Sequence, residues 1–136
     1  MKCSWPSLER MSNEDQIRDL LKTFERALET SHVALAAGCY MKDAVAMGAG
    51  FPTLAGSEMP GVYVQLFKDV QMNVAFTIDE LVVASDTVAY ALSRSNGTQR
   101  VRESGVEHPE SNREMFIFGR EDGLWKIARY MFNKTE

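Results

Sequence analysis

Four polar residues in the second half of the chain have types and spacings that could support chemistry: Tyr90, Arg94, Glu114 and Tyr130. Each lies in a run that reads as a β-strand. If Glu114 faces the interior, strand alternation places the other three on the same side. Burial in an apolar pocket raises the pKa of a carboxyl group, which suits a general acid or base near neutral pH. The tyrosine hydroxyls could donate hydrogen bonds to a carbonyl oxygen.

The role of Glu114 depends on whether Arg94 lies beside it. A neighbouring guanidinium holds a carboxylate ionised, which makes Glu114 a structural anchor or an acceptor for a ligand hydroxyl. Without that neighbour, Glu114 is a candidate general acid or base, with Tyr130 or Tyr90 as electrophilic helper. In the structural alternative, Arg94 and Glu114 form a cross-strand pair and the tyrosines only satisfy their hydroxyls at the edge of the core.

The other candidate ligand contacts are mainly apolar and aromatic. Strand alternation places four of them on the interior face and two come from the first half of the chain: Leu92, Phe116, Phe118, Phe132, Phe24 and Tyr40. Tyr40 also fits a core position. His108 could reach over a pocket mouth, or it is a solvated loop residue. The histidine and carboxylate spacing does not match a metal site, and we expect neither metal nor cofactor.

Hydrophobic periodicity orders the elements as helices followed mainly by strands, an α+β fold. Ser12 or Asn13 is expected to cap a first helix, Ser31 a second over 33–37, and Ser57 a third that has Pro60 in its first turn. Strands are expected over 43–47, 73–84, 87–95, 114–118 and 124–132. The polar segment 96–112 is predicted to be an extended hairpin end, a mobile loop, or both. Residues 1–12 are predicted to be a flexible lead-in to a single domain, 13–136.

Alternation along the two strands of the C-terminal hairpin gives two faces, and both are apolar. One face is expected to close on helices and the other to meet another subunit, because a hairpin with a solvated back is apolar on one face only. The residues assigned to this outer face are Met115, Ile117, Trp125, Ile127 and Met131. A homodimer is therefore expected.

Composition excludes several classes of partner. The 136-residue chain has a net charge of −4, which disfavours nucleic acid or an anionic membrane surface as the main partner. No apolar run approaches the length of a membrane span, and the N-terminus lacks the apolar core of a signal peptide. Cys3 and Cys39 lack disulfide or zinc spacing, so we expect free thiols and a cytoplasmic location.

Several segments together resemble the nuclear-transport-factor-2-like superfamily, in its SnoaL-like, ketosteroid-isomerase-like branch of small bacterial proteins. They are the helix phrase 20–28, Tyr40-Met41-Lys42-Asp43-Ala44-Val45, Gly56, Asn112-Arg113-Glu114, and the ending Gly123-Leu124-Trp125-Lys126-Ile127-Ala128-Arg129-Tyr130-Met131-Phe132-Asn133. The resemblance implies a cone in which a curved antiparallel sheet wraps around the N-terminal helices. It also implies a deep apolar pocket and dimerisation through the outer face of the sheet.

This chain departs from the ketosteroid isomerase pattern at two of three positions. Gly48 stands where the resemblance requires a carboxylate base, and Phe24 where it requires an oxyanion-hole tyrosine. Glu114 falls in register with the third residue, a protonated acid. Tyr130 replaces the aspartate of a last-strand phrase common in relatives. We therefore expect a pocket for a small apolar or polyketide-like molecule, with cofactor-free isomerisation, cyclisation or dehydration as its chemistry if it is catalytic, but not ketosteroid isomerisation. The alternative is a non-catalytic ligand-binding or dimerisation module.

Overall fold

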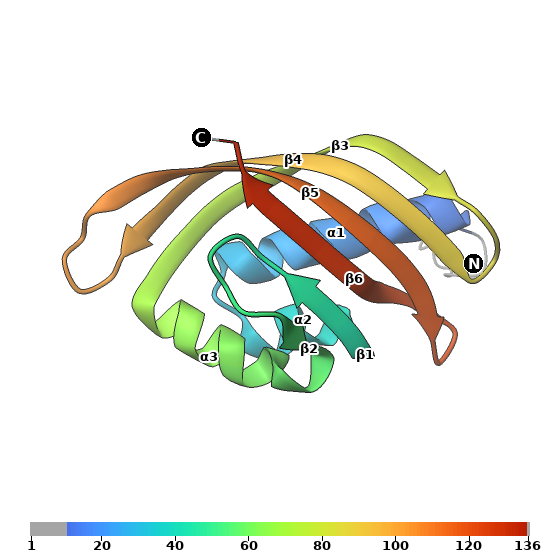
Figure 1. Ribbon diagram of the computed structural model, residues 1–136, viewed down its shortest axis with the longest axis horizontal. Coiled ribbons are helices and arrows are strands. Elements are labelled where there is room, and N and C mark those ends of the chain that lie inside the picture. Colours follow the sequence, from blue (N-terminus) through green and yellow to red (C-terminus); the bar gives the residue numbers. More distant parts are fainter. Residues whose placement is uncertain (1–10, 136) are drawn as a thin grey trace, which may run out of the picture.

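The computed structural model of the chain describes residues 11–135, and it shows an α+β fold with a six-stranded sheet (Figure 1). The elements in chain order are α1 (Asn13–Glu29), α2 (Val33–Gly38), β1 (Tyr40–Met47), β2 (Leu54–Ala55), the 3-10 helix η2 (Gly56–Glu58), α3 (Met59–Asp69), β3 (Val70–Val83), β4 (Val88–Val101), β5 (Glu107–Glu121) and β6 (Leu124–Lys134). Most of the segment 1–12, predicted to be flexible, lies outside the described residues.

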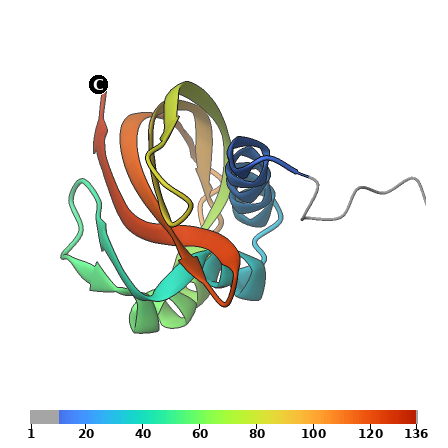
Figure 2. The same cartoon turned by 90° about the vertical axis from the view of Figure 1, so that its right-hand side faces the viewer.

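The first helix forms as its sequence predicts. The Ser12 hydroxyl accepts a hydrogen bond from the Asp15 backbone N–H at 3.1 Å, which satisfies one of the free donors of the first turn. Its buried stripe consists of Ile17, Leu21, Phe24, Ala27 and Leu28. In Figure 1 the long strands β3, β4 and β5 arch over α1, and Figure 2 shows α1 against one side of these strands, with α3 near the lower end of the sheet.

The caps of the next two helices differ from those predicted. His32, rather than Ser31, caps α2, because its Nδ1 accepts the Leu35 N–H at 3.1 Å. Ser31 instead has a positive φ of 54°, in the left-handed region that reverses the chain. Ser57 lies within η2, and α3 begins at Met59 with Pro60 in its first turn, where a missing N–H leaves no helical bond unmade.

The sheet has the strand order β2-β1-β6-β5-β4-β3. Four of its five neighbouring pairs are antiparallel, and β1 and β6 run parallel, so the sheet is mixed rather than wholly antiparallel. The chain leaves β1 through β2, α3 and three further strands before β6, and a crossover of that length permits parallel pairing. The α+β class and the sheet that curves around the helices are otherwise as expected.

The polar segment 96–112 is mostly an extended hairpin end. Strands β4 and β5 remain paired from Asn96↔Ser111 to Arg100↔Glu107 and turn through 102–106. Arg102 fastens this end to the rest of the fold, since its Nε donates to the Phe67 carbonyl at 2.7 Å and its backbone N–H to the Asp69 carbonyl at 2.9 Å. Most of the polar residues of segment 96–112 therefore lie on paired strands rather than in a loop.

The predicted interior face of β4 is wrong by one residue. Ser93 pairs with Glu114, so the side chains that share the face of Glu114 are Ala89, Ala91, Ser93 and Ser95, all at most 3% exposed. Tyr90, Leu92 and Arg94 therefore lie on the outer face. Alternation in the sequence does not show which face of β4 is buried. The small residues of one face and the larger apolar residues of the other both fit a half-buried strand.

A β-bulge corrects the predicted faces of β6. The register shifts between Ile117↔Arg129 and Phe118↔Ile127, which leaves Ala128 as the extra residue. Trp125 and Ile127 thus face the core, at 4% and 0% exposed, and do not belong to the outer face. The other predicted outer residues, Met115, Ile117 and Met131, are exposed at 47%, 38% and 46%. The homodimer through this face stays a prediction.

Two further expectations concern the thiols and the membrane. Cys39 is a buried free thiol, and burial raises its pKa to about 11, so it remains protonated; Cys3 lies outside the described residues. Within residues 11–135, none of the helices is long and apolar enough to cross a bilayer.

Candidate functional site

A cavity of about 380 Å³ lies among the inner side chains of α1, α3 and the long strands. Its apolar lining is Phe24, Leu28, Ala49, Gly50, Phe51, Leu66, Met72, Val74, Phe76 and Phe132, and its polar or amphipathic lining is Tyr63, Ser95, Gln99, Glu110, Asn112, Tyr130 and Lys134. This combination of apolar walls with a few polar groups is typical of sites for small organic molecules.

A second cavity of about 400 Å³ adjoins the first on the side of β1 and α3. Five residues line both: Phe51, Tyr63, Leu66, Tyr130 and Phe132. Phe51 is 57% exposed and its ring centroid lies 6.5 Å from that of Phe132. The two cavities are therefore separated mainly by aromatic side chains, of which Phe51 is exposed at the surface.

Tyr130 presents a fixed phenol to these cavities. Its ring stacks on Phe116 with centroids 4.5 Å apart and an interplanar angle of 4°, and it meets Phe24 edge-on at 6.0 Å. Its hydroxyl makes no hydrogen bond with any residue between 11 and 135, and it is not among the buried orphaned atoms, so it is open to the cavity. Burial, and to a lesser extent the charge of Glu114, raise the pKa of Tyr130 well above its ordinary value. The phenol is thus a hydrogen-bond donor at neutral pH.

Glu114 is a buried carboxyl group, 5% exposed, that accepts hydrogen bonds from two hydroxyls. Ser93 Oγ donates to its Oε1 at 2.6 Å, and Ser95 Oγ donates to its Oε2. No cation pairs with it among the described residues. Burial raises the pKa of Glu114, the two serine hydroxyls offset part of this rise, and the charge of Asp79 adds to it. Glu114 does not line the cavity itself, whereas its partner Ser95 does.

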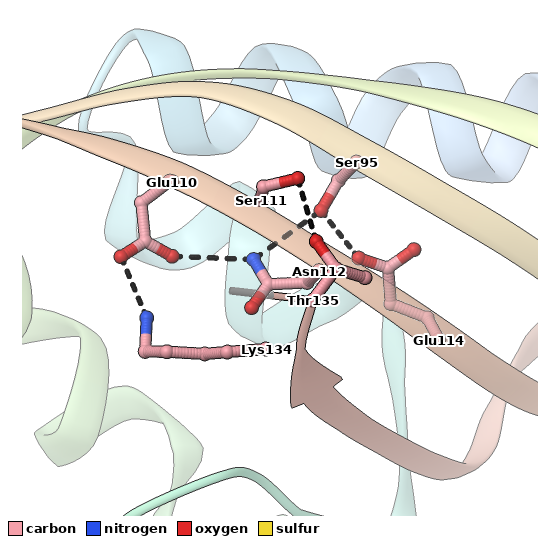
Figure 3. Close-up of polar contacts among 7 residues, drawn as sticks. All are labelled: Ser95, Glu110, Ser111, Asn112, Glu114, Lys134 and Thr135. Atoms are coloured by element: carbon pink, nitrogen blue, oxygen red, sulfur yellow. Dashed lines mark hydrogen bonds and ion pairs between the residues drawn. The ribbon is translucent and has the colours of Figure 1, made fainter.

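A chain of polar contacts connects this carboxyl group to the surface (Figure 3). Asn112 Nδ2 donates to Ser95 Oγ at 3.4 Å and to Glu110 Oε2 at 3.2 Å, and Glu110 Oε1 pairs with Lys134 Nζ at 2.8 Å. Asn112 is 7% exposed, and its Oδ1 is a buried atom with no partner among residues 11–135. Such an orphaned acceptor costs about 1–3 kcal/mol.

The neighbours of Glu114 in this chain of contacts were missed by the sequence interpretation, although a signal for them existed. Ser93 and Ser95 on β4, and Glu110, Asn112 and Glu114 on β5, are polar residues spaced by two. Such spacing on adjacent antiparallel strands predicts one polar strip on a shared face. The assignment of 96–112 as partly loop concealed it.

Of the two alternatives for Arg94, the one in which it pairs with Glu114 is wrong. Arg94 lies on the outer face and makes a bidentate pair with Asp79, with Nη2–Oδ1 at 2.8 Å and Nε–Oδ2 at 2.9 Å. This pair lowers the pKa of Asp79. Tyr90 and Leu92 share that face and, like Arg94, line neither of the two cavities. The four polar candidates therefore do not converge on the first cavity: Tyr130 lines it, with Glu114 behind Ser95. Arg94 and Glu114 both line a different hollow of about 390 Å³, which neither tyrosine lines.

The aromatic and histidine candidates divide between cavity and core. Phe24 and Phe132 line the first cavity, and Tyr40 lines the second, where its hydroxyl lies 2.8 Å from that of Tyr63. Phe116 and Phe118 are 0% exposed and line neither, because they pack beneath Tyr130 and the neighbouring strands. The predicted lid residue His108 is instead an exposed strand residue opposite Gln99 and also lines neither cavity.

The position at which the resemblance requires a carboxylate base is sterically closed. A Cβ added to Gly48 would lie 2.5 Å from Phe132 Cε2, so the Phe132 ring occupies the space into which a side chain would extend. At the expected oxyanion-hole position Phe24 contributes no hydroxyl. Within the part of the chain that the structure describes, no group of three histidine, cysteine or acidic residues could hold a metal ion. The polar groups that line the first cavity are thus those of Tyr63, Ser95, Gln99, Glu110, Asn112, Tyr130 and Lys134.

No protein-family model matches the chain, and no curated protein matches it significantly. Solved structures do match it. A ketosteroid isomerase-like protein from Erwinia carotovora atroseptica is 28% identical with a TM-score of 0.81, over 92% of this chain and 99% of that chain. An NTF2-like protein with a cystatin-like fold from Novosphingobium aromaticivorans is 15% identical with a TM-score of 0.70, over 91% of this chain and 82% of that chain.

A third similar structure is a hexachlorocyclohexane dehydrochlorinase, 16% identical with a TM-score of 0.78, over 95% of this chain and 89% of that chain. The three likenesses extend over nearly the whole of residues 11–135 rather than over one motif. The chain therefore has the nuclear-transport-factor-2-like fold, and its resemblance to ketosteroid-isomerase-like proteins, expected from the sequence, is confirmed.

Proposed function

We propose that the protein binds a small, largely apolar molecule in the cavity beneath the sheet, with Tyr130 donating a hydrogen bond to an acceptor oxygen of that molecule. The observation that carries the proposal is the free Tyr130 hydroxyl in an aromatic cavity of about 380 Å³. Aromatic walls from Phe24, Phe76 and Phe132 favour a planar or ring-containing ligand. A carbonyl group is the acceptor that a neutral phenol serves best.

Fixed orientation of the phenol supports this assignment. Stacking on Phe116 and edge contact with Phe24 hold the Tyr130 ring in place before any ligand arrives, so binding costs little side-chain entropy. In contrast, the hydroxyls of Tyr40 and Tyr63 bond to each other at 2.8 Å, which uses the hydrogen of one of them. Of these three cavity tyrosines, Tyr130 is the one whose hydroxyl has no hydrogen-bond partner among residues 11–135.

Titration with 2-acetonaphthone, a planar ketone, tests the proposal by calorimetry. Tyr130→Phe should weaken binding about fivefold, since one net hydrogen bond is worth about 1 kcal/mol and about 1.4 kcal/mol is a factor of ten. Tyr90→Phe is the matched control, because Tyr90 lies on the outer face and should leave the affinity unchanged. Failure of the ketone to bind, or equal losses in the two variants, contradicts the proposal.

Proton transfer is a second candidate function, favoured by one observation. Ser95 lines the cavity, and its Oγ donates to Glu114, whose pKa is raised. A ligand proton could pass to Ser95 Oγ while the Ser95 proton moves to Glu114 Oε2, which would serve isomerisation, cyclisation or dehydration without a cofactor. The hexachlorocyclohexane dehydrochlorinase shows by its name that an elimination enzyme occurs on this fold.

Exchange of the α-protons of 2-tetralone in D₂O, followed by NMR, separates binding from catalysis. If Glu114 accepts protons, the protein accelerates exchange and Glu114→Gln abolishes the acceleration. If exchange matches the buffer rate while 2-acetonaphthone binds, the cavity is a binding site without this chemistry.

A further inference from the structure

The orphaned oxygen of Asn112 is a polar group that the proposed function does not use. Asn112 is 93% buried, lines the cavity, and has both amide hydrogens directed at neighbours while Oδ1 has no partner within 11–135. In Figure 3 the amide oxygen points away from Ser95 and Glu110. Buried acceptors of this kind are rare in folded proteins and call for an explanation.

The contacts of Asn112 fix which amide atom is the orphan. Glu110 Oε2, 3.2 Å from the side-chain amide, belongs to a carboxylate that pairs with Lys134 and can only accept. Ser95 Oγ gives its hydrogen to Glu114, so toward Asn112 it also accepts. Both neighbours therefore require the amide nitrogen, and turning the amide over would place its oxygen against the Glu110 carboxylate. The oxygen is consequently held in position without a donor.

Lys134 is the side chain beside this oxygen. It is the direct cross-strand partner of Asn112, so the two side chains leave the same face of neighbouring strands. In Figure 3 its aliphatic stem runs beside the amide oxygen and ends at Glu110. The Lys134 side chain is 50% exposed, so its ammonium group can move outward into solvent. The Glu110 side chain is 12% exposed and would keep the Asn112 amide as its hydrogen-bond donor.

We infer that Asn112 Oδ1 is the acceptor for a hydrogen-bond donor of the ligand, and that Lys134 is a movable cover over it. This inference rests on the proposed function, and it narrows the ligand class. The ligand is an apolar ring compound that carries a hydroxyl or N–H group at the end of the cavity near Asn112, Glu110 and Gln99. The acceptor group that Tyr130 serves lies elsewhere on the same molecule. Asn112 then discriminates hydroxylated compounds from their ethers, because an ether leaves its oxygen unsatisfied.

The test compares 2-naphthol with 2-methoxynaphthalene by calorimetry. Both compounds have the same ring system and a single oxygen, so neither carries a separate acceptor for Tyr130. Only the naphthol can donate a hydrogen bond to Asn112 Oδ1, so the ratio of the two dissociation constants isolates the donor. We expect 2-naphthol to bind about fivefold more tightly to the unaltered protein, because one net hydrogen bond is worth about 1 kcal/mol. In Asn112→Ala the ratio falls to about one. In Lys134→Ala it rises above that of the unaltered protein, because the cover is gone.

Lys68→Ala, on the exposed side of α3, is the matched control and leaves the ratio unchanged. A ratio near one in the unaltered protein, or a ratio that survives Asn112→Ala, overturns the role of Asn112. If Asn112→Ala does not fold, Lys134→Ala still decides, since an unchanged ratio in that variant overturns the cover. Binding of 2-acetonaphthone with no preference between the naphthyl compounds refutes this inference alone. Failure of all three compounds to bind refutes the proposed function as well.

Discussion

Replacement of Glu114 by glutamine should stabilise the protein at high pH and have little effect at low pH. Glutamine keeps the size of the side chain and one carbonyl acceptor while it removes the charge. The pKa of Glu114 is raised above its ordinary value of 4.5 although two hydroxyls donate to the carboxyl group. Burial therefore outweighs the hydrogen bonds, and the ionised form is the destabilising one.

The sign of the pH dependence follows from proton linkage. Between the unfolded and folded pKa values, the folded chain keeps the proton on Glu114 while the unfolded chain has lost it. The free energy of unfolding therefore falls as the pH rises through this window, by at most about 1.4 kcal/mol per pH unit for a single group. Above the folded pKa the full cost is present. The Glu114→Gln variant has no such cost of ionisation. Its gain in the free energy of unfolding over the unaltered protein therefore grows across this pH window and then stays constant.

Urea unfolding of both proteins at half-unit steps from pH 4 to pH 8 measures this difference. Glu103→Gln, an exposed residue of the β4–β5 turn, controls for the general effect of losing a negative charge. A difference that does not depend on pH would refute the argument. So would a glutamine variant that loses more stability at pH 8 than at pH 4, because the serines would then be stabilising the carboxylate.

Two further predictions concern packing and assembly. Gly48→Ala should destabilise the protein by about 1–3 kcal/mol, since the new methyl group would overlap Phe132. Gly61→Ala in α3 is the control and should not destabilise the protein, because no atom lies within 4 Å of its added Cβ. Urea unfolding midpoints of the two variants would distinguish these outcomes. An exposed apolar row crosses the outer face of the sheet and consists of Leu92, Met115 and Met131. If the expected dimer forms through this face, the double variant Leu92→Arg, Met115→Arg should be monomeric in light scattering. Val64→Arg on α3 is the control and should leave the dimer intact. An unaltered protein that is monomeric at every concentration contradicts the expected dimer.

The helices and the overall class were predictable because their signals are local. The Ser12 cap and the stripe of Ile17, Leu21, Phe24 and Leu28 specify α1 without reference to any other element. The order of elements then gave the α+β class. The sequence does not show whether Ser31 or His32 caps α2, since either side chain can accept an N–H. The positive φ of Ser31 in the structure distinguishes the two residues, and His32 is the cap.

The faces of two strands could not be deduced because they depend on pairing between strands. On β4, the side chains of Ala89 and Ala91 are too small and too weakly hydrophobic to identify their face as the buried one. On β6, the bulge at Ala128 reverses the alternation halfway along the strand, so no single phase fits both Ile127 and Tyr130. Register errors of one residue exchange the two faces completely.

These register effects also decided how much of the site was foreseen. Tyr130 and Glu114 were identified, and both face the interior. The supporting residues Ser93, Ser95 and Asn112 were missed, because each was on a strand or segment whose face or type was misassigned. Arg94 was placed beside Glu114 by the same error, and its actual partner is Asp79.

A crystal structure of the protein soaked with 2-acetonaphthone would show whether the cavity binds a planar ketone through Tyr130. We expect the naphthyl rings among Phe24, Phe76 and Phe132, with the ketone oxygen within hydrogen-bond distance of Tyr130 Oη. Density for the ketone on the outer face of the sheet, or a cavity that stays empty at saturating ketone concentration, would contradict it.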